Sequence, residues 1–385
     1  MSAQTALPTS SPDSARLDRL LGYLEQDRTN EQLRGDVFDE ALRVGALDVA
    51  QRLADEAGAE GGPAWQHRRA MLALRCGDYA TARALLLELV AAGEAHPAVR
   101  YNAAYAALRA GEYAVAEHEA AGLLDSIPEA MELLLSALHH QRRVDEAIDL
   151  FRQRGGAAAA TNGAIGVASL VAVDASAFVD AENWAQQALA VNDRQLDALT
   201  AMGSMLLGQQ RNGQARACLE RALAIAPHDG RVLSAMGMCE LSEMQLEAAR
   251  HYFTLAIRAL PLHVGTWHGL GWCCIAQHDF ATAAHAFDAA IAVDRNFGES
   301  HGGAAIVHAL RGNVAEAREA ARRAQGLDPK GLSAAYALAL LDGKITADMA
   351  AFEQFASGVL EGRTDISGKI RLIDIVARHL RPPQG

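Results

Sequence analysis

Aromatic residues are scarce in this sequence. Phe, Trp and Tyr make up only 5% of the 385 residues, although 50% of the residues are hydrophobic. The interior must therefore be built mainly from alanine and leucine, which suit closely packed helices. A β-sandwich would need more aromatic and β-branched side chains. The composition thus favours a helical fold.

Cysteine and lysine are also few. The five cysteines include no Cys-x-x-Cys pair, which argues against a disulfide framework and fits a reducing compartment. Only three lysines stand against many arginines, and together with the abundant alanine this indicates a GC-rich bacterial genome. The net charge of −12 argues against nucleic acid and against anionic membrane surfaces as partners, because both attract basic proteins.

Long hydrophobic runs are absent. No stretch of about 18 uncharged apolar residues occurs, so we expect no transmembrane helix and no membrane insertion. The first residues lack the basic region and apolar run of a secretory signal, so the predicted location is the cytoplasm. Residues 1–14 are rich in Ser, Thr and Pro and are expected to form a disordered tail.

Motifs for catalysis or cofactor binding are missing as well. No Gly-x-Gly-x-x-Gly follows a predicted strand, and neither a Walker motif nor a Gly-x-Ser-x-Gly elbow is present. Two histidine pairs invite a metal site, His263 with His268 and His301 with His308. The second pair is two helical turns apart, whereas zinc ligands converge on one point. We therefore predict no catalytic residue, no cofactor and no metal.

The sequence does contain a repeat of 34 residues. Self-similarity at a fixed period of this length is typical of stacked helical hairpins. The recurring residues, one group for each position of the repeat, are Leu199, Leu233, Trp267 and His301; Gly203, Gly237, Gly271 and Ala305; Ala215, Ala249, Ala283 and Ala317; Leu219, Phe253, Phe287 and Ala321; Ala222, Ala256, Ala290 and Ala324; and Pro227, Pro261, Arg295 and Pro329.

These positions have physical reasons. A small residue in the first helix and an alanine in the second let the two helices approach closely, and the Leu or Phe position fills the space below them. A second alanine lets the next hairpin dock, and the proline ends the second helix. Because a single hairpin cannot bury its apolar face alone, neighbouring hairpins must stack.

The repeat extends back to residue 31 and predicts nine hairpins behind an N-terminal capping helix at 15–30. Residues 332–380 are expected to hold a degenerate hairpin and a C-terminal capping helix, since an open end would expose core. A Gly/Ala-rich stretch at 155–163 is either a hinge between two arms or a loose loop. The predicted hairpins are 31–62, 63–96, 97–127, 128–161, 162–195, 196–229, 230–263, 264–297 and 298–331.

The pattern resembles the tetratricopeptide repeat (TPR). The resemblance covers nearly the whole chain, with departures at Leu135, Ser169 and Arg295. It implies an all-α, right-handed α-solenoid of about nine to ten TPR hairpins with terminal capping helices. The residues closest to the family consensus are Trp267, Gly271, Phe280, Ala283, Phe287 and Ala290.

The resemblance also implies a binding groove. In this family the first helices line a concave face, and residues 2, 5, 6, 9, 12 and 13 of each hairpin point toward the ligand. The groove so predicted is basic and aromatic in its N-terminal part and apolar in its C-terminal part. Its protein-binding residues are expected to be His67, Arg68, Met71, Arg75, Tyr101, Asn102, Tyr105, Arg109, Met238, Leu241, His268, Trp272, Ile275 and Ile306.

The function that follows is a non-catalytic scaffold or adaptor, which would hold a peptide or helix of a partner protein in the groove. Two alternatives stay open: a chaperone or accessory factor of a bacterial secretion or envelope-assembly system, and a self-assembling scaffold that forms homo-oligomers. An enzyme is disfavoured, because the sequence outside the repeats is too short for a catalytic domain.

Overall fold

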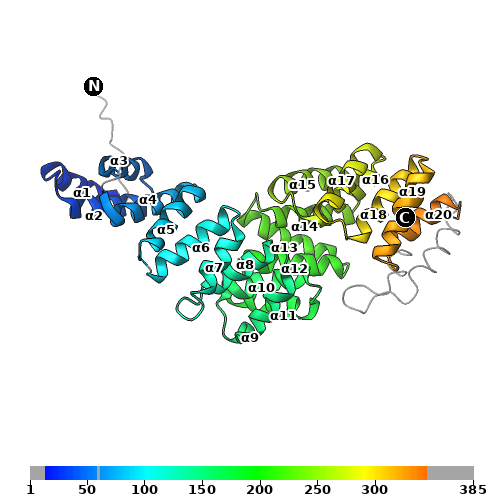
Figure 1. Cartoon of the computed structure of the whole chain (residues 1–385), viewed down its shortest axis with the longest axis horizontal. Helices are drawn as coiled ribbons and strands as arrows, with labels where there is room; N and C mark the ends of the chain where they lie inside the picture. Colours follow the sequence, from blue (N-terminus) through cyan, green and yellow to red (C-terminus); the bar gives the residue numbers. More distant parts are fainter. Residues whose placement is uncertain (1–13, 59–60, 95, 345–385) are drawn as a thin grey trace, which may run out of the picture. The chain divides into compact units, whose positions relative to one another are not determined.

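The computed structural model describes residues 14–58, 61–94 and 96–344. These residues form α-helices α1 to α20, one short 3-10 helix at Gly156–Ala158, and no strand (Figure 1). The expected all-helical solenoid fold is therefore confirmed. The predicted disordered tail, except Ser14, and the predicted C-terminal capping helix lie outside the described residues.

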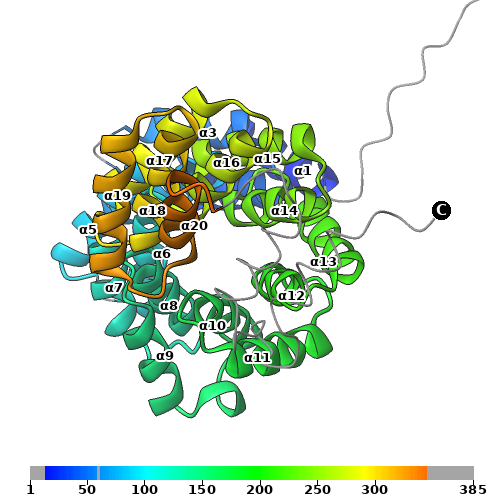
Figure 2. The same cartoon turned by 90° about the vertical axis from the view of Figure 1, so that its right-hand side faces the viewer.

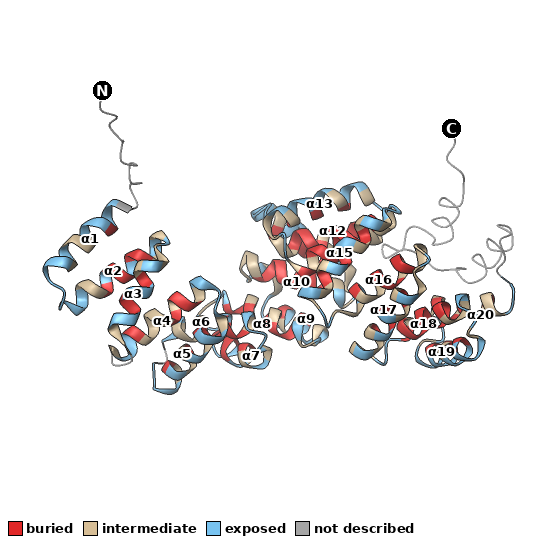
Figure 3. Ribbon diagram, turned by 90° about the horizontal axis from the view of Figure 1, so that it is seen from above, coloured by how far each residue is buried: buried red, intermediate tan, exposed pale blue. Residues whose placement is uncertain are grey.

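The chain divides into two compact units, Met1–Ala164 and Ile165–Gly385. The division falls directly after the Gly/Ala stretch 155–163, for which a hinge stays a prediction. Each compact unit is described by itself below. In both, buried residues concentrate where helices face one another (Figure 3).

The first compact unit consists of a leading helix and four helical hairpins. Leu17 of the leading helix is buried with Val37, Phe38 and Trp65, so this helix covers apolar surface of the first hairpin. The helices are α1 (Ser14–Gln26), α2 (Glu31–Val44), α3 (Leu47–Ala57), α4 (Gly62–Cys76), α5 (Tyr79–Ala91), α6 (Pro97–Arg109), α7 (Tyr113–Ala121), α8 (Ala130–His140) and α9 (Val144–Gln153).

The second compact unit continues the hairpins. From α11 to α20 each helix packs on the next one along the chain, so first and second helices alternate in contact. The helices are α10 (Asn162–Asp174), which begins just before the division, α11 (Phe178–Val191), α12 (Leu196–Gly208), α13 (Asn212–Ile225), α14 (Gly230–Ser242), α15 (Leu246–Ala259), α16 (Val264–Ala276), α17 (Phe280–Val293), α18 (Gly298–Leu310), α19 (Val314–Leu327) and α20 (Leu332–Leu341).

The turn inside each hairpin has one residue with a left-handed backbone. Glycine takes this position in some hairpins, for example Gly77 with φ of 78° and Gly312 with φ of 78°. Five hairpins use another residue there, with φ between 58° and 62°, a conformation that disfavours a side chain. The position recurs every 34 residues through the second compact unit, whatever residue occupies it. We infer that packing of the flanking helices, and not the turn residue itself, holds this backbone conformation. These five residues are Arg142, Ser176, Gln210, Met244 and His278.

Large second-helix residues fit between small residues of two first helices. Phe253 of α15 is completely buried. A Cβ added at Gly237, in its own hairpin, would lie 2.7 Å from its ring, and one added at Gly269, in the next hairpin, would lie 2.4 Å away. Phe287 meets Gly271 and Gly303 in the same way. The Phe position therefore fills the space beside glycines of two consecutive first helices.

The size of the second-helix side chain and the sizes of the first-helix residues that it contacts change together along the array. Leu219, smaller than phenylalanine, lies against Gly203 and clusters with Ala235 rather than with a glycine. At the end of the array, Ala321 clusters with Ala305 and Ala337. The space between consecutive first helices is thus matched to one second-helix side chain in each hairpin, as close packing requires.

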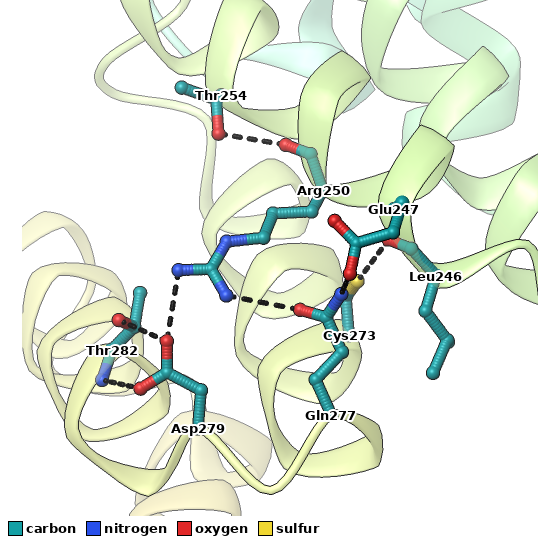
Figure 4. Close-up of polar contacts among 8 residues, drawn as sticks. All are labelled: Leu246, Glu247, Arg250, Thr254, Cys273, Gln277, Asp279 and Thr282. Carbon is teal, nitrogen blue, oxygen red and sulfur yellow. Dashed lines mark hydrogen bonds and ion pairs between the residues drawn. The ribbon is translucent and has the colours of Figure 1, made fainter.

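Polar side chains link consecutive hairpins away from this core. Arg250 of α15 donates to Gln277 Oε1 at 3.1 Å and to Asp279 Oδ2 at 2.9 Å, both in the following hairpin (Figure 4). Asp279 also caps α17 by accepting the Thr282 backbone N–H at 3.1 Å. Gln277 in turn donates to Glu247 Oε1 at 2.8 Å. One arginine therefore fixes the turn of the next hairpin against its own helix.

The same link recurs at the equivalent position of other hairpins. Arg83 pairs with Glu112, Arg216 with both Glu240 and Glu243, and Arg318 with Asp342. Between α7 and the next hairpin the charges are exchanged, with Glu117 accepting from Arg143 at 2.7 Å. These pairs connect residues that the period of the repeat brings together.

We expect Arg250→Ala to lower the free energy of unfolding by about 1 kcal/mol, because two hydrogen bonds across a half-exposed interface are lost. Urea unfolding followed by tryptophan fluorescence measures this. Arg258→Ala is the matched control, since Arg258 is an exposed arginine on the same helix. Equal midpoints for the two variants would contradict a role for Arg250 in joining the hairpins.

Candidate functional site

The first helices form the inner face of the second compact unit. The helices α12, α14, α16 and α18 contact one another in order, in addition to contacting their own second helices. Figure 2 shows α12 and α18 on the inner side of this curve, with α13 and α19 outside them. Side chains on the exposed side of these first helices therefore converge.

A cleft of about 470 Å³ lies on this inner face. Four first helices, α10, α12, α14 and α16, contribute its walls, together with the residues that flank them. Apolar and small polar side chains alternate with a few charged groups. The lining residues are Leu170, Val173, Asp174, Thr200, Ser204, Leu207, Gly208, Gln210, Arg231, Ser234, Ala235, Met238, Ser242, His263 and Gly265.

An ion pair in the cleft joins two residues that are 57 positions apart in sequence. Arg231, at the start of α14, donates to both carboxylate oxygens of Asp174, at the end of α10, with the Nη1–Oδ1 distance at 3.0 Å. Arg231 Nη1 also lies 3.3 Å from His263 Nε2. Because a guanidinium only donates, His263 Nε2 is the acceptor.

The second ring nitrogen of His263 continues this network. His263 Nδ1 lies 2.7 Å from the Thr266 hydroxyl, which donates to the Ser234 hydroxyl at 2.9 Å. Thr266 and Ser234 are both buried. The imidazole therefore joins the charged rim of the cleft to its buried floor.

Asp197 lies on the same face of α12 as the cleft residues Thr200 and Ser204, one and two turns before them. Burial raises the pKa of Asp197 to about 6, and the nearby Asp229 carboxylate raises it further, while Arg231 acts in the opposite direction. The carboxylate accepts from the side-chain amide of Gln195 at 3.3 Å. A carboxyl group with this pKa beside a cleft is a candidate for ligand binding.

A larger hollow, of about 590 Å³, lies in the first compact unit between α3, α4 and α5. Two of these three helices are second helices, and Gln51, Asp55, Arg69 and Glu88 are among its lining residues. The hollow is therefore not formed by the first helices alone.

The predicted groove residues of the first compact unit are largely engaged with neighbours. Arg68 forms a two-pronged pair with Asp39, at 3.0 and 2.9 Å, and lies 5.3 Å from the Trp65 ring. His67 is half-buried, and burial followed by the Arg68 charge lowers the pKa of its imidazole. This stretch is therefore less basic toward a ligand than the sequence suggests.

Four of the remaining predicted residues there, Met71, Asn102, Tyr105 and Arg109, make side-chain contacts. Asn102 Nδ2 lies 3.4 Å from the Met71 sulfur. The exposed Tyr105 meets Tyr79 edge to face, and Arg109 lies over the Tyr79 ring at 5.1 Å. Tyr101 is half-buried, which raises the pKa of its phenol. Arg75 is exposed.

The predicted groove residues of the second compact unit separate into exposed and buried ones. Met238 is 44% exposed and lines the cleft, whereas Leu241 and Ile275 are half-buried against the core. Trp272 packs edge to face on Phe287 at 6.0 Å between ring centres and keeps part of its surface exposed. One part of its side chain therefore packs in the core, and another part is exposed to solvent.

The prediction for Ile306 must be corrected. This residue was expected in the groove, but it is fully buried in a cluster with Ala305, Ala321 and Ala337, because α20 packs on α18. His268 is also enclosed: its ring meets Phe287 and Phe297 edge to face, each at 5.3 Å, and burial lowers its pKa to about 4.

Trp267, in contrast, is less buried than the sequence predicts. The repeat places it at a packing position, yet its side chain is only half-buried. Its indole N–H donates to the Pro261 carbonyl at 2.8 Å, and its ring edge meets His285. The indole therefore braces the turn before α16 rather than filling the core.

Comparison with known proteins settles the family. The family model described as "Tetratricopeptide repeat" matches residues 67–125, 101–160, 200–264 and 270–331, more than half of the chain. The chain belongs to the tetratricopeptide repeat family. Members of this family are generally non-catalytic protein-interaction modules.

Solved TPR structures resemble the chain only distantly. The Cut9–Hcn1 hetero-tetramer of the APC/C is 14% identical over 93% of this chain and 82% of that one, with a TM-score of 0.45. YrrB, a TPR protein with an unusual peptide-binding site, is 16% identical over 51% and 97%, with a TM-score of 0.36. No curated protein matches the chain.

The ligand-facing TPR positions include charged residues of the cleft that the sequence prediction did not name. Asp197 and Arg231 are the second residues of their hairpins and Asp174 is the thirteenth, so all three occupy ligand-facing TPR positions. For the three hairpins that hold these residues, the sequence prediction named only Met238 and Leu241 and missed the charged side chains. His263, the last residue of its hairpin, falls outside the rule.

Two absences hold for the described residues. No group of three or more His, Cys, Asp or Glu side chains there could hold a metal ion. No helix of that part is both long and apolar enough to cross a membrane.

Proposed function

We propose that this TPR protein is a non-catalytic scaffold that holds a segment of a partner protein in the cleft between α10, α12, α14 and α16. The observation that carries the proposal is the lining of that cleft. Apart from Gln210 and His263, its residues occupy positions 2, 5, 6, 9, 12 and 13 of their hairpins, which face ligands in this family. Peptide segments bind such grooves through apolar anchors, with polar groups that fix the register.

The same proposal places the protein in a reducing cytoplasm. The described structure contains five free cysteines, of which Cys239, Cys273 and Cys274 are buried. Burial raises the pKa of each of these three thiols, so they are poorly reactive. Neither a secretion-system chaperone nor a homo-oligomeric scaffold has a specific feature in its favour.

The partner can be identified by photo-crosslinking. A photoreactive phenylalanine analogue placed at Ser204, in the cleft, should capture a partner from cells of the source organism. The same analogue at Glu220, an exposed residue of the second helix α13, is the control. Equal capture from the two positions would argue against the cleft.

Met238→Arg should then weaken binding of the identified partner at least tenfold, because a long charged side chain would occupy the cleft. Met238 is 44% exposed, so the fold should tolerate the change. Met244→Arg is the matched control, since Met244 is 65% exposed in the turn after α14. Calorimetric titration measures both. An unchanged affinity for Met238→Arg would rule out the cleft as the binding site.

A further inference from the structure

The charges around the cleft are unequal. Three carboxylates, Asp174, Asp197 and Asp229, lie near a single guanidinium, that of Arg231. His263 adds at most one further positive charge, and its Nε2 lies 3.3 Å from the same guanidinium. This part of the inner face therefore carries net negative charge.

The three carboxylates differ in how they are compensated. Asp174 is paired with Arg231. Asp229 caps α14, where it accepts the backbone N–H groups of Arg231 at 2.9 Å and Val232 at 3.0 Å. Asp197, which is half-buried, accepts the neutral amide of Gln195 at 3.3 Å, a long contact for a carboxylate. Among these groups, Asp197 has the most to gain from a cation.

The cationic group in the cleft is not open to an anionic ligand. Arg231 directs Nη1 and Nη2 at the Asp174 carboxylate, and Nη1 also at His263. A ligand carboxylate would have to displace Asp174 and would then face Asp197 and Asp229. Repulsion between these like charges would disfavour binding of an anionic ligand.

The cleft also has an apolar stretch that lies farther along the first helices than Asp197. Leu170 of α10, Leu207 of α12 and Met238 of α14 line it together with small residues such as Ser204 and Ser234. Leu207 follows Asp197 by ten residues, about 15 Å along α12, so apolar side chains that neighbour the basic residue in the bound segment would contact this stretch.

We propose that the cleft binds an extended segment of a partner protein that inserts a lysine or arginine beside Asp197, while apolar side chains of the same segment pack against Leu170, Leu207 and Met238. This rests on the proposed function and adds the chemistry of the partner. A cation there would replace the missing charge partner of Asp197, and the remaining carboxylates would favour it further.

The proposal has a consequence for pH. Burial raises the pKa of Asp197 to about 6, so this carboxyl is mostly protonated at pH 5 and mostly ionised at pH 7. A cation that binds the ionised form should bind up to about tenfold more tightly at pH 7 than at pH 5. Asp229 and Gln195 at the starts of their helices, Arg231 on α14, Asp174 on α10 and His263 before α16 are the other groups that face this region. Protonation of His263 would weaken a cation in the same direction, so the Asp197 contribution must be isolated by substitution.

Capped peptide pools provide the test on the full chain. Fluorescein-labelled heptapeptides carry Lys, Arg, norleucine or Glu at the centre and randomised Ala, Ser, Gln, Val and Leu at the flanks, and fluorescence polarisation measures binding. We expect the Lys and Arg pools to bind at least tenfold more tightly than the other two. Asp197→Asn should reduce that preference below threefold and remove most of the pH dependence. Asp288→Asn, at an exposed position on the second helix α17, should leave both unchanged.

The outcomes separate the two proposals. If the norleucine or Glu pool binds as tightly as the Lys pool, and Met238→Arg abolishes that binding, the cleft binds segments but the cationic inference is wrong. If the Lys preference persists in Asp197→Asn, Asp197 is not its cause and the inference is wrong. If the crosslinked partner needs the cleft but no pool binds, the inference fails while the proposed function stands. If Met238→Arg affects neither partner nor peptides, both fail.

Discussion

Replacing Gly269 with alanine should lower the free energy of unfolding by about 2 kcal/mol. The new Cβ would lie 2.4 Å from two ring atoms of Phe253, which is fully buried and already confined by Gly237. Overpacking of this kind costs about 1–3 kcal/mol, and the higher helix propensity of alanine offsets only part of it. Urea unfolding followed by tryptophan fluorescence reports this region directly, because Trp267 and Trp272 lie in the same helix, α16.

The array itself supplies the compensating change. Leu219 occupies the position of Phe253 one hairpin earlier, and there the following first helix carries Ala235. Phe253→Leu combined with Gly269→Ala reproduces that combination and should recover at least half of the lost stability. A double-mutant cycle should therefore show a coupling of about 1 kcal/mol or more.

Gly326→Ala provides the control, since a Cβ at this helical glycine meets nothing within 4 Å. It should be neutral or stabilising. If Gly269→Ala were equally harmless, or if Phe253→Leu only added to its cost, the matching of residue sizes between hairpins would be wrong.

The sequence predicted the contacts inside a hairpin better than those between hairpins. Gly237 and Phe253 recur with the 34-residue period, so their contact follows from the repeat alone. Gly269 recurs as alanine in earlier hairpins, which hides its role. Its importance appears only when its neighbour in the preceding hairpin is known. The arginine links, such as Arg250 to Asp279, were missed for the same reason.

The candidate site shows the same limit. TPR numbering places Asp174, Asp197 and Arg231 on the inner face, but no spacing reveals that Arg231 reaches a residue 57 positions earlier. That pairing depends on how α10, α12 and α14 curve together. Ile306 failed as a groove residue because α20, from a degenerate hairpin, packs on its helix. The numbering gives the face of a helix, and the neighbouring helix decides whether that face is open.

Acidification should destabilise the chain through His268. Burial lowers the pKa of its imidazole from 6.5 to about 4, and Phe287 and Phe297 enclose the ring. Between pH 6.5 and pH 4 the unfolded chain binds a proton that the folded chain excludes, so stability falls as the pH falls through this window. From pH 7 to pH 5 this one group should remove about 2 kcal/mol, at 1.36 kcal/mol for each unit of pKa difference.

His268→Gln tests this, because glutamine keeps a polar group near the Ser300 hydroxyl, 3.0 Å from His268 Nε2, and does not titrate. The variant should lose about 2 kcal/mol less than the native chain between pH 7 and pH 5, whatever its stability at pH 7. His285→Gln serves as the control, since His285 is an exposed histidine on the neighbouring helix α17. Urea midpoints at the two pH values give each difference. If the native chain and His268→Gln lose the same stability, the ring is already accessible to protons in the folded state, and the enclosure of His268 between the two phenylalanines does not persist in solution.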